Sequence, residues 1–267
     1  MSEAALLEVK NLSVRFANAA QQVDCVSDFS LAVARGECVG VVGESGAGKS
    51  QAFLAIMGLL APGGTASGSA RFESRELIGA SPAALDGIRG ARLAMIFQNP
   101  MTSLTPHLRV GEQVAELFVK HRDLSWRAAR ARALETLELV QLPEPARRAR
   151  QYPHELSGGM RQRVMIATAL ACDPALVIAD EPTTALDVTI QAQILALLAE
   201  LKRAQRLSLV LITHDLGVVA GLADRVAVVC QGRIVECAPV GTILRSPAHA
   251  YTQSLLKDAL RADGLDP

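Results

Sequence analysis

An eight-residue run constrains the fold of this chain more than any other feature. Residues 43–50 read Gly-Glu-Ser-Gly-Ala-Gly-Lys-Ser and match the pattern G-x-x-x-x-G-K-S/T. An apolar, strand-like run precedes it at Glu37–Val42, and a helical pattern follows over Gly48–Leu60. Glycines in such a loop let backbone N–H groups surround phosphate oxygens, and the following helix directs its N-terminus at the anion. The pattern therefore predicts a strand–loop–helix unit of an α/β fold that binds the phosphates of a nucleotide.

The residue types in this loop, called the P-loop below, have distinct chemical roles. The lysine brings positive charge to the β- and γ-phosphates, and the serine hydroxyl ligates Mg²⁺. An ordinary glycine-rich turn is the alternative, but the strand before the loop and the helix after it argue against a plain turn. The predicted nucleotide-binding residues are Gly43, Glu44, Ser45, Gly46, Ala47, Gly48, Lys49 and Ser50.

Strand-like and helical segments alternate in the second half of the chain. The apolar runs Leu176–Ala179 and Leu209–Thr213 are followed by the helical patterns Val188–Arg203 and Leu216–Leu222. A further strand-like run, Ala227–Val229, leads into a turn at Gly232. Strands that alternate with helices favour a mostly parallel sheet with helices on both faces. The sequence thus predicts one α/β domain.

Residues 98–167 differ from this pattern, because prolines separate several helical stretches there. One predicted helix, Trp126–Leu142, follows Ser125, a residue type that commonly caps helix N-termini. We therefore expect a helical subdomain at 98–167 inserted into a core made of 1–97 and 168–245. A tail at 246–267 completes this single domain of 267 residues.

Composition excludes some classes of protein. Half of the residues are apolar and only 3% are aromatic, which predicts a large and mainly aliphatic core. The 27 basic and 27 acidic residues cancel, whereas a protein that coats nucleic acid shows a basic excess. No secretory signal is evident, and the longest apolar run, near Ala52–Ala61, is shorter than the roughly 20 residues that a spanning helix needs. A soluble, cytosolic protein is expected.

The five cysteines are dispersed, odd in number and free of C-x-x-C pairs. Disulfide frameworks use even numbers of cysteines, and zinc or iron–sulfur clusters need several thiolates close together. The sequence therefore predicts neither a disulfide framework nor a cysteine-bound metal.

A second motif ends the apolar run Leu176–Ala179 with two carboxylates, Asp180 and Glu181. In P-loop enzymes generally, an aspartate in this place holds Mg²⁺. The adjacent glutamate is suited to orient or deprotonate an attacking water. Acidic residues often close strands for structural reasons alone, so the P-loop in the same chain is what favours the catalytic interpretation.

A third motif is the turn Ser157-Gly158-Gly159, which precedes a helical run over Arg161–Ala171. Such a turn gives a second helix N-terminus with backbone N–H groups directed at an anion. Taken alone, it is more typical of an ordinary helix cap.

In this order the three motifs resemble those of ABC (ATP-binding cassette) proteins. Leu156–Met160 then resembles the signature motif, with Met160 where glutamine is usual. Gln98 resembles the Q-loop glutamine, and Thr184–Asp187 the D-loop with threonine in place of the commoner serine. His214 resembles the switch histidine that contacts the γ-phosphate. Phe16 is the candidate for stacking on adenine, with core packing as the alternative.

Finer features narrow the resemblance. Three further runs and one residue are similar to ATPase subunits of bacterial dipeptide, oligopeptide and nickel importers. They are Asn99–Leu104, Asp187–Gln193, Ser246–Gln253 and Met160. The resemblance implies an α/β, ABC-type P-loop NTPase core with a mostly parallel sheet, an antiparallel N-terminal β subdomain and the inserted helical subdomain. It implies an ATPase that energises import, with ATP and Mg²⁺ as cofactors.

The resemblance also assigns roles and partners. Glu181, His214 and Gln98 would be catalytic, and Ser50, Gln98 and Asp180 would hold Mg²⁺. Two cassettes, identical or paralogous, would pair head to tail, with the turn Ser157, Gly158 and Gly159 of one facing the nucleotide of the other. Two membrane permease subunits would carry the solute, delivered by an extracytoplasmic solute-binding protein, and the cassette would lie at the cytoplasmic face of the bacterial inner membrane.

Two questions stay open at this point. A cytosolic ABC ATPase acting in translation or DNA repair is the alternative function, disfavoured by the neutral charge and the single cassette. The solute is a peptide or a nickel or other metal chelate. Many peptide-importer ATPases carry a cysteine-containing extension, whereas only fourteen residues follow Gln253 here, which slightly favours the nickel branch and predicts no metal besides Mg²⁺.

Overall fold

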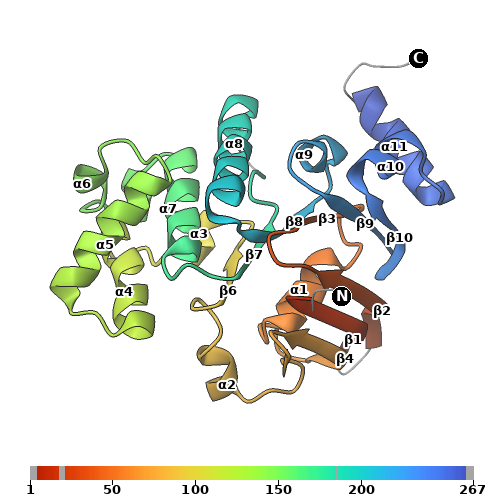
Figure 1. The fold of residues 1–267 in the computed structure, drawn as a ribbon, viewed down its shortest axis with the longest axis horizontal. Helices are drawn as coiled ribbons and strands as arrows, with labels where there is room; N and C mark the ends of the chain where they lie inside the picture. Colours follow the sequence, from red (N-terminus) through yellow and green to blue (C-terminus); the bar gives the residue numbers. More distant parts are fainter. Residues whose placement is uncertain (1–4, 18–21, 185, 263–267) are drawn as a thin grey trace. The chain divides into compact units, whose positions relative to one another are not determined.

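The structure is a computed structural model that describes residues 5–17, 22–184 and 186–262. It divides into two compact units (Figure 1). Unit 1 contains Met1–Leu85 and Ser208–Pro267, and unit 2 contains Asp86–Leu207. The division predicted from the sequence, with a helical subdomain at 98–167, has other boundaries and stays a prediction.

Unit 1 contains an antiparallel sheet in the strand order β2-β1-β4-β5. Strand β1 carries buried aliphatic side chains on one face, beginning with Leu7 and Val9, and polar ones on the other, which is the alternation of a half-buried strand. The predicted antiparallel N-terminal subdomain is therefore confirmed. The strands are β1 (Leu7–Ala17), β2 (Gln22–Val33), β4 (Gly64–Phe72) and β5 (Arg75–Glu76).

Unit 1 also contains the parallel strands expected for an α/β fold. Strand β3 pairs in parallel with β8 and with β9, and β10 runs antiparallel to β9. Every residue of β3 and β8 is buried, as is usual where helices cover both faces. The elements are β3 (Cys38–Val42), β8 (Ser208–Thr213), β9 (Arg225–Cys230), β10 (Arg233–Pro239), α1 (Lys49–Ile56), α9 (Leu216–Ala220), α10 (Val240–Arg245) and α11 (Ala250–Ala262).

Unit 2 combines two parallel strands with most of the helices. Strand β6 (Leu93–Ile96) pairs in parallel with β7 (Leu176–Asp180), and helices α4, α5, α6 and α7 gather in the green part of Figure 1. The helices are α3 (Pro100–Ser103), α4 (Val110–Arg122), α5 (Trp126–Leu139), α6 (Pro145–Arg148), α7 (Gly158–Leu170) and α8 (Val188–Gln205), with a 3-10 turn at Pro153–Glu155. Along the sequence, helix α2 (Pro82–Asp86) contains the point where the first segment of unit 1 ends and unit 2 begins.

Two helix ends illustrate how local sequence sets the elements. Helix α5 begins as predicted, because the Ser125 hydroxyl accepts a hydrogen bond from the Ala128 N–H at 3.4 Å. Helix α1 ends at Ile56, four residues before the predicted Leu60. Gly58 has a φ of +63°, and a Cβ there would lie 2.5 Å from Leu85 Cδ1, so the chain turns away at this glycine. In the part of the chain that the structure describes, no helix combines the length and apolar character needed to cross a membrane.

Candidate nucleotide-binding and catalytic site

The P-loop leaves the buried strand β3 and enters α1, as predicted from the sequence. Gly43, Gly46 and Gly48 have φ values of +155°, +81° and +91°. A Cβ at Gly43 would lie 2.1 Å from Val229 O, and one at Gly48 would lie 2.2 Å from Cys25 O. A Cβ at Gly46 would meet nothing within 4 Å. Two of the glycines are thus needed for packing against the protein, and the third faces open space where a phosphate can approach.

The P-loop folds around the ammonium group of Lys49. This side chain is only 5% exposed, and its Nζ donates to Gly43 O at 2.6 Å and to Glu44 O at 2.8 Å. The Ala47 N–H also donates to Glu44 O, at 3.2 Å. A largely buried positive charge at the start of a helix favours an anion strongly, because little solvent screens it.

The sequence did not reveal which segments support the P-loop. The Gly232 N–H, in the turn between β9 and β10, donates to Ala47 O at 2.9 Å, and Gly232 O accepts from Ser27 N–H at 2.9 Å. Strand β2 approaches from the same side, because Cys25 O is the atom that a Cβ on Gly48 would meet. Gly232 was predicted only as a turn. No local pattern marks a backbone contact between segments so distant in the sequence.

His214 starts from the same edge of the sheet as the P-loop. Strands β3 and β8 are parallel, with Val42 opposite Thr213, so Gly43 and His214 both follow the carboxyl ends of neighbouring strands. Ligands of open α/β sheets bind at this edge. The side chain of His214 is exposed, and Asp215 fixes the turn by accepting a hydrogen bond from Gly217 N–H at 2.7 Å.

Phe16 lies on β1 in unit 1 and is half-buried. Its ring rests against Gly64 on β4, where a Cβ would lie 2.7 Å from Phe16 Cε1. One part of the ring is therefore packed and another is open, so adenine stacking stays a prediction.

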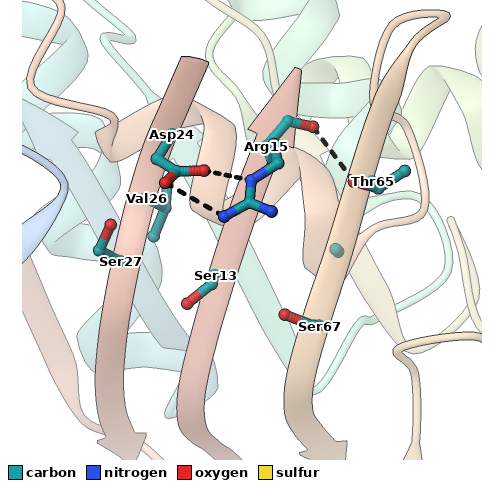
Figure 2. Close-up of a pocket in the computed structure, with 8 residues that line it drawn as sticks. Ser13, Arg15, Asp24, Val26, Ser27, Thr65 and Ser67 are labelled. Atoms are coloured by element: carbon teal, nitrogen blue, oxygen red, sulfur yellow. Dashed lines mark hydrogen bonds and ion pairs between the residues drawn. The ribbon is translucent and has the colours of Figure 1, made fainter. Parts of the chain in front are cut away.

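A polar hollow of about 500 Å³ lies on the same antiparallel sheet (Figure 2). Arg15 follows the strand alternation and points away from the face that carries Phe16. Its guanidinium bonds both carboxylate oxygens of Asp24. The hydrogen bond from Arg15 lowers the pKa of Asp24. Because this pair compensates its own charge, the described lining of the hollow has no net charge. The other lining side chains are Ser13, Val26, Ser27, Thr65, Ala66 and Ser67.

In unit 2 the paired carboxylates stand at the end of β7, as predicted. Asp180 is 6% exposed, and Glu181 is half-buried just beyond the strand. Glu181 has a φ of +44°, a left-handed conformation that residues other than glycine seldom adopt. Such strained positions cluster at functional sites, where the surrounding structure holds them.

The carboxylate of Glu181 is held by two donors. Gln98 Nε2 donates to Glu181 Oε2 at 3.0 Å, and Thr184 Oγ1 donates to the same oxygen at 2.7 Å. Gln98 reaches this position because β6 and β7 are parallel, with Ile96 opposite Ala179. Three residues singled out separately in the sequence therefore meet at one carboxylate. Ala185, the second residue of the predicted D-loop, lies outside the described residues.

The Ser-Gly-Gly turn caps α7 in unit 2. The Ser157 hydroxyl accepts from Met160 N–H at 3.4 Å, while the side chain itself is exposed. A Cβ on Gly159 would lie 2.8 Å from Ile190 Cγ2, so this glycine lets α7 approach α8 closely. A cap and close helix packing account for part of the motif, and the exposed serine is what remains for a ligand.

Comparison with known proteins identifies this arrangement of motifs. The family model described as "ABC transporter" matches residues 26–184. The chain belongs to the ABC transporter family. As a member of the ABC family it is an ATP-binding ATPase, and the predicted fold class is confirmed by structural relatives.

Two relatives and one solved structure are similar to this chain over most of its length. The oligopeptide transport ATP-binding protein OppD of Haemophilus influenzae is 50% identical over 259 residues, which cover 97% of this chain and 80% of that protein. The dipeptide transport ATP-binding protein DppD of the same organism is 52% identical over 254 residues, covering 95% of this chain and 77% of that protein. The ATP-binding cassette MJ0796, solved as a post-hydrolysis dimer with ADP and Pi, is 30% identical with a TM-score of 0.78, covering 88% of this chain and 98% of that one.

The packing of the P-loop glycines in this ABC protein gives a first prediction. Gly48→Ala should destabilise the fold by about 2–4 kcal/mol, because it adds a backbone clash to the cost of a left-handed conformation. Gly46→Ala has the same conformational cost without the clash and should lose about 1–2 kcal/mol. Urea unfolding of the two variants measures the difference. Equal losses would show that Cys25 does not restrict the loop.

Proposed function

We propose that this chain is the ATP-hydrolysing subunit of a bacterial importer of peptides. The observation that carries the proposal is the identity of about half, over nearly the whole chain, with transport proteins named for oligopeptides and dipeptides. Peptides are therefore favoured over nickel chelates as the solute. The alternative function, a cytosolic ABC ATPase acting in translation or DNA repair, is not favoured. The net charge of zero also argues against a protein that binds nucleic acid.

Residues of the right chemistry for ATP and Mg²⁺ occur in each unit taken by itself. In unit 1 the open space at Gly46 and the buried ammonium of Lys49 fit a phosphate chain, and His214 leaves the same strand edge. Mg²⁺ prefers oxygen ligands, and the sequence-predicted set of Ser50, Gln98 and Asp180 provides hydroxyl, amide and carboxylate oxygens. When bound, the ion would neutralise charge on the β- and γ-phosphates.

Glu181 is suited to activate the attacking water. A proton passes from water to the Glu181 carboxylate while the water oxygen bonds to the γ-phosphorus. The bond from that phosphorus to the bridging oxygen breaks, which releases ADP and phosphate. Gln98 and Thr184 both donate to Glu181 Oε2, so they orient the carboxylate that is proposed to accept the proton.

The exposed Ser157 is proposed to act on the nucleotide of a second cassette. Its turn is a helix N-terminus separate from the P-loop, in the other unit of the chain. Val188, at the start of α8 just after the D-loop, is 83% exposed, the highest exposure among the large apolar side chains of the described residues. An apolar residue beside the signature and D-loop segments fits a surface that a partner cassette covers in the ATP-bound state.

Ser157→Arg should therefore abolish ATP-dependent dimerisation while the chain still binds ATP at its own P-loop. The long cationic side chain would occupy the place proposed for the partner's γ-phosphate. Light scattering with ATP in the Glu181→Gln background, which slows hydrolysis, measures the dimer. Ser254→Arg, at an exposed serine on α11, is the matched control. Normal dimerisation of the Ser157 variant would contradict action in trans.

Transport requires further subunits, and we propose membrane permeases and a solute-binding protein outside the cell. The cassette would then lie peripherally at the cytoplasmic face of the inner membrane. Reconstitution of the chain with the permease subunits that co-purify with it tests the solute: labelled tripeptide should enter vesicles only with ATP and wild-type cassette. Uptake of nickel chelate with no uptake of peptide would overturn the peptide assignment and leave the ATPase assignment intact.

A further inference from the structure

The segment Ser246–Gln253 has no part in the proposed reaction, yet it reaches the P-loop. Tyr251, in the first turn of α11, accepts a hydrogen bond at its hydroxyl oxygen from the Glu44 N–H, at 3.2 Å. The two residues are 207 positions apart in the sequence and lie in the same unit. Tyr251 is half-buried. Burial raises the pKa of its hydroxyl, which therefore stays neutral at physiological pH.

The bond to Tyr251 involves the peptide group that also binds the P-loop lysine. Glu44 N–H and Gly43 O belong to one peptide group, and in a trans peptide these two groups point in opposite directions. Gly43 O accepts from Lys49 Nζ at 2.6 Å, while Glu44 N–H donates to Tyr251. The peptide is therefore held from both sides, and bonds arranged in series polarise one another.

Tyr251 is itself fixed through Glu236 on β10. The two carboxylate oxygens of Glu236 accept from Ala248 N–H at 2.8 Å and from His249 N–H at 3.0 Å. His249 Nδ1 in turn accepts from Tyr251 N–H at 3.2 Å. Burial raises the pKa of Glu236, but hydrogen bonds that include those from the Ala248 and His249 amides outweigh this effect, so the pKa is lowered and the group is ionised at neutral pH.

We propose that Tyr251 is a positioning residue for the nucleotide. Through its hydroxyl, the segment Ser246–Gln253 holds the Gly43–Glu44 peptide and so sets the Lys49 ammonium in place before ATP binds. Preorganisation of this kind raises affinity, because the loop loses less conformational freedom on binding. By linkage, bound nucleotide also stabilises the docking of α11. The inference rests on the proposed nucleotide site.

Tyr251→Phe removes only the hydroxyl and tests this role directly. We expect the Kd for the nonhydrolysable analogue AMP-PNP with Mg²⁺ to rise about three- to tenfold, the range for loss of one neutral hydrogen bond. In the assembled transporter the KM for ATP should rise by the same factor while kcat at saturation stays constant. Tyr152→Phe, at the other tyrosine of the chain and in unit 2, is the matched control and should bind like wild type.

Glu236→Gln tests the anchor of the segment. One carboxylate oxygen becomes an amide group that cannot accept, so either Ala248 or His249 loses its partner, and the Kd should rise about two- to fivefold. If the anchor acts through Tyr251, the double variant binds as weakly as Tyr251→Phe alone. If the two increases in Kd multiply in the double variant, Glu236 and Tyr251 act independently. That result would overturn the proposal that Glu236 acts through Tyr251.

The outcomes separate this inference from the function on which it rests. If wild-type protein fails to bind AMP-PNP, the nucleotide site itself is wrong. If wild type binds and Tyr251→Phe binds equally well, the positioning role alone is refuted. A lower kcat with an unchanged KM would also refute it. Thermal unfolding of each variant without nucleotide identifies a general loss of stability, which would lower the apparent kcat by reducing the folded fraction and would leave KM unchanged.

Discussion

Glu181→Gln is expected to lower ATP turnover about 10²–10⁴-fold, which is the range for loss of a general base. The Kd for nucleotide should stay within about twofold of the wild-type value. Glutamine has the shape of glutamate, but it cannot accept the proton of the attacking water. Phosphate release in the assembled transporter measures turnover, and calorimetry with AMP-PNP measures affinity. The closed, ATP-bound dimer should also become easier to trap, because hydrolysis no longer resets it.

The geometry around Glu181 allows this substitution to remove the basicity of the side chain without changing its orientation. Gln98 and Thr184 both donate to Oε2, and the carbonyl oxygen of a glutamine side chain accepts the same two bonds. The orientation of the side chain should therefore persist while its basicity is lost. Glu138→Gln, at an exposed glutamate on α5 of the same unit, is the control and should keep the wild-type rate. If the Glu181→Gln variant hydrolyses ATP at the wild-type rate, Glu181 is not the general base.

The local features of the site were predictable from the sequence for a physical reason. The P-loop is one continuous run of eight residues, so its pattern of glycines, lysine and serine can be recognised without knowledge of the tertiary structure. The same holds for the Ser157 cap on α7, which depends on residues three positions apart. The carboxylates of Asp180 and Glu181 follow a buried strand, which hydrophobic pattern alone detects.

Contacts between distant segments were not predictable in the same way. Gln98 and Glu181 were each identified, but their hydrogen bond spans 83 positions and depends on the register of β6 against β7. The support of the P-loop by Gly232 and Cys25 is made by backbone atoms, which carry no residue signature. Tyr251 lies in the run Ser246–Gln253, whose only feature in the sequence is its resemblance to importer ATPase subunits. Its contact with Glu44 requires the position of α11, which is set by tertiary packing.

Lys49→Ala should weaken ATP binding about 10- to 100-fold, the loss that corresponds to roughly 1.5–3 kcal/mol for a hydrogen bond to a charged group. Because Lys49 is only 5% exposed, salt screens its charge little, so the ratio of the variant Kd to the wild-type Kd should be nearly the same at low and high salt. Calorimetry with AMP-PNP at two ionic strengths measures both effects. Lys10→Ala, at an exposed lysine of unit 1, should bind like wild type.

A second variant separates the charge and hydrogen bonds of Lys49 from the packing of its side chain. The ammonium also donates to Gly43 O and Glu44 O, so alanine removes both an attraction for phosphate and a support of the loop. Lys49→Met keeps most of the length and packing of the side chain and removes only the charge and its donors. If charge dominates, the methionine and alanine variants lose affinity equally. If affinity is unchanged in both, the assignment of residues 43–50 as the phosphate-binding loop is wrong. A methionine variant that binds like wild type would show that Lys49 acts by filling space, since an apolar side chain offers nothing to a phosphate.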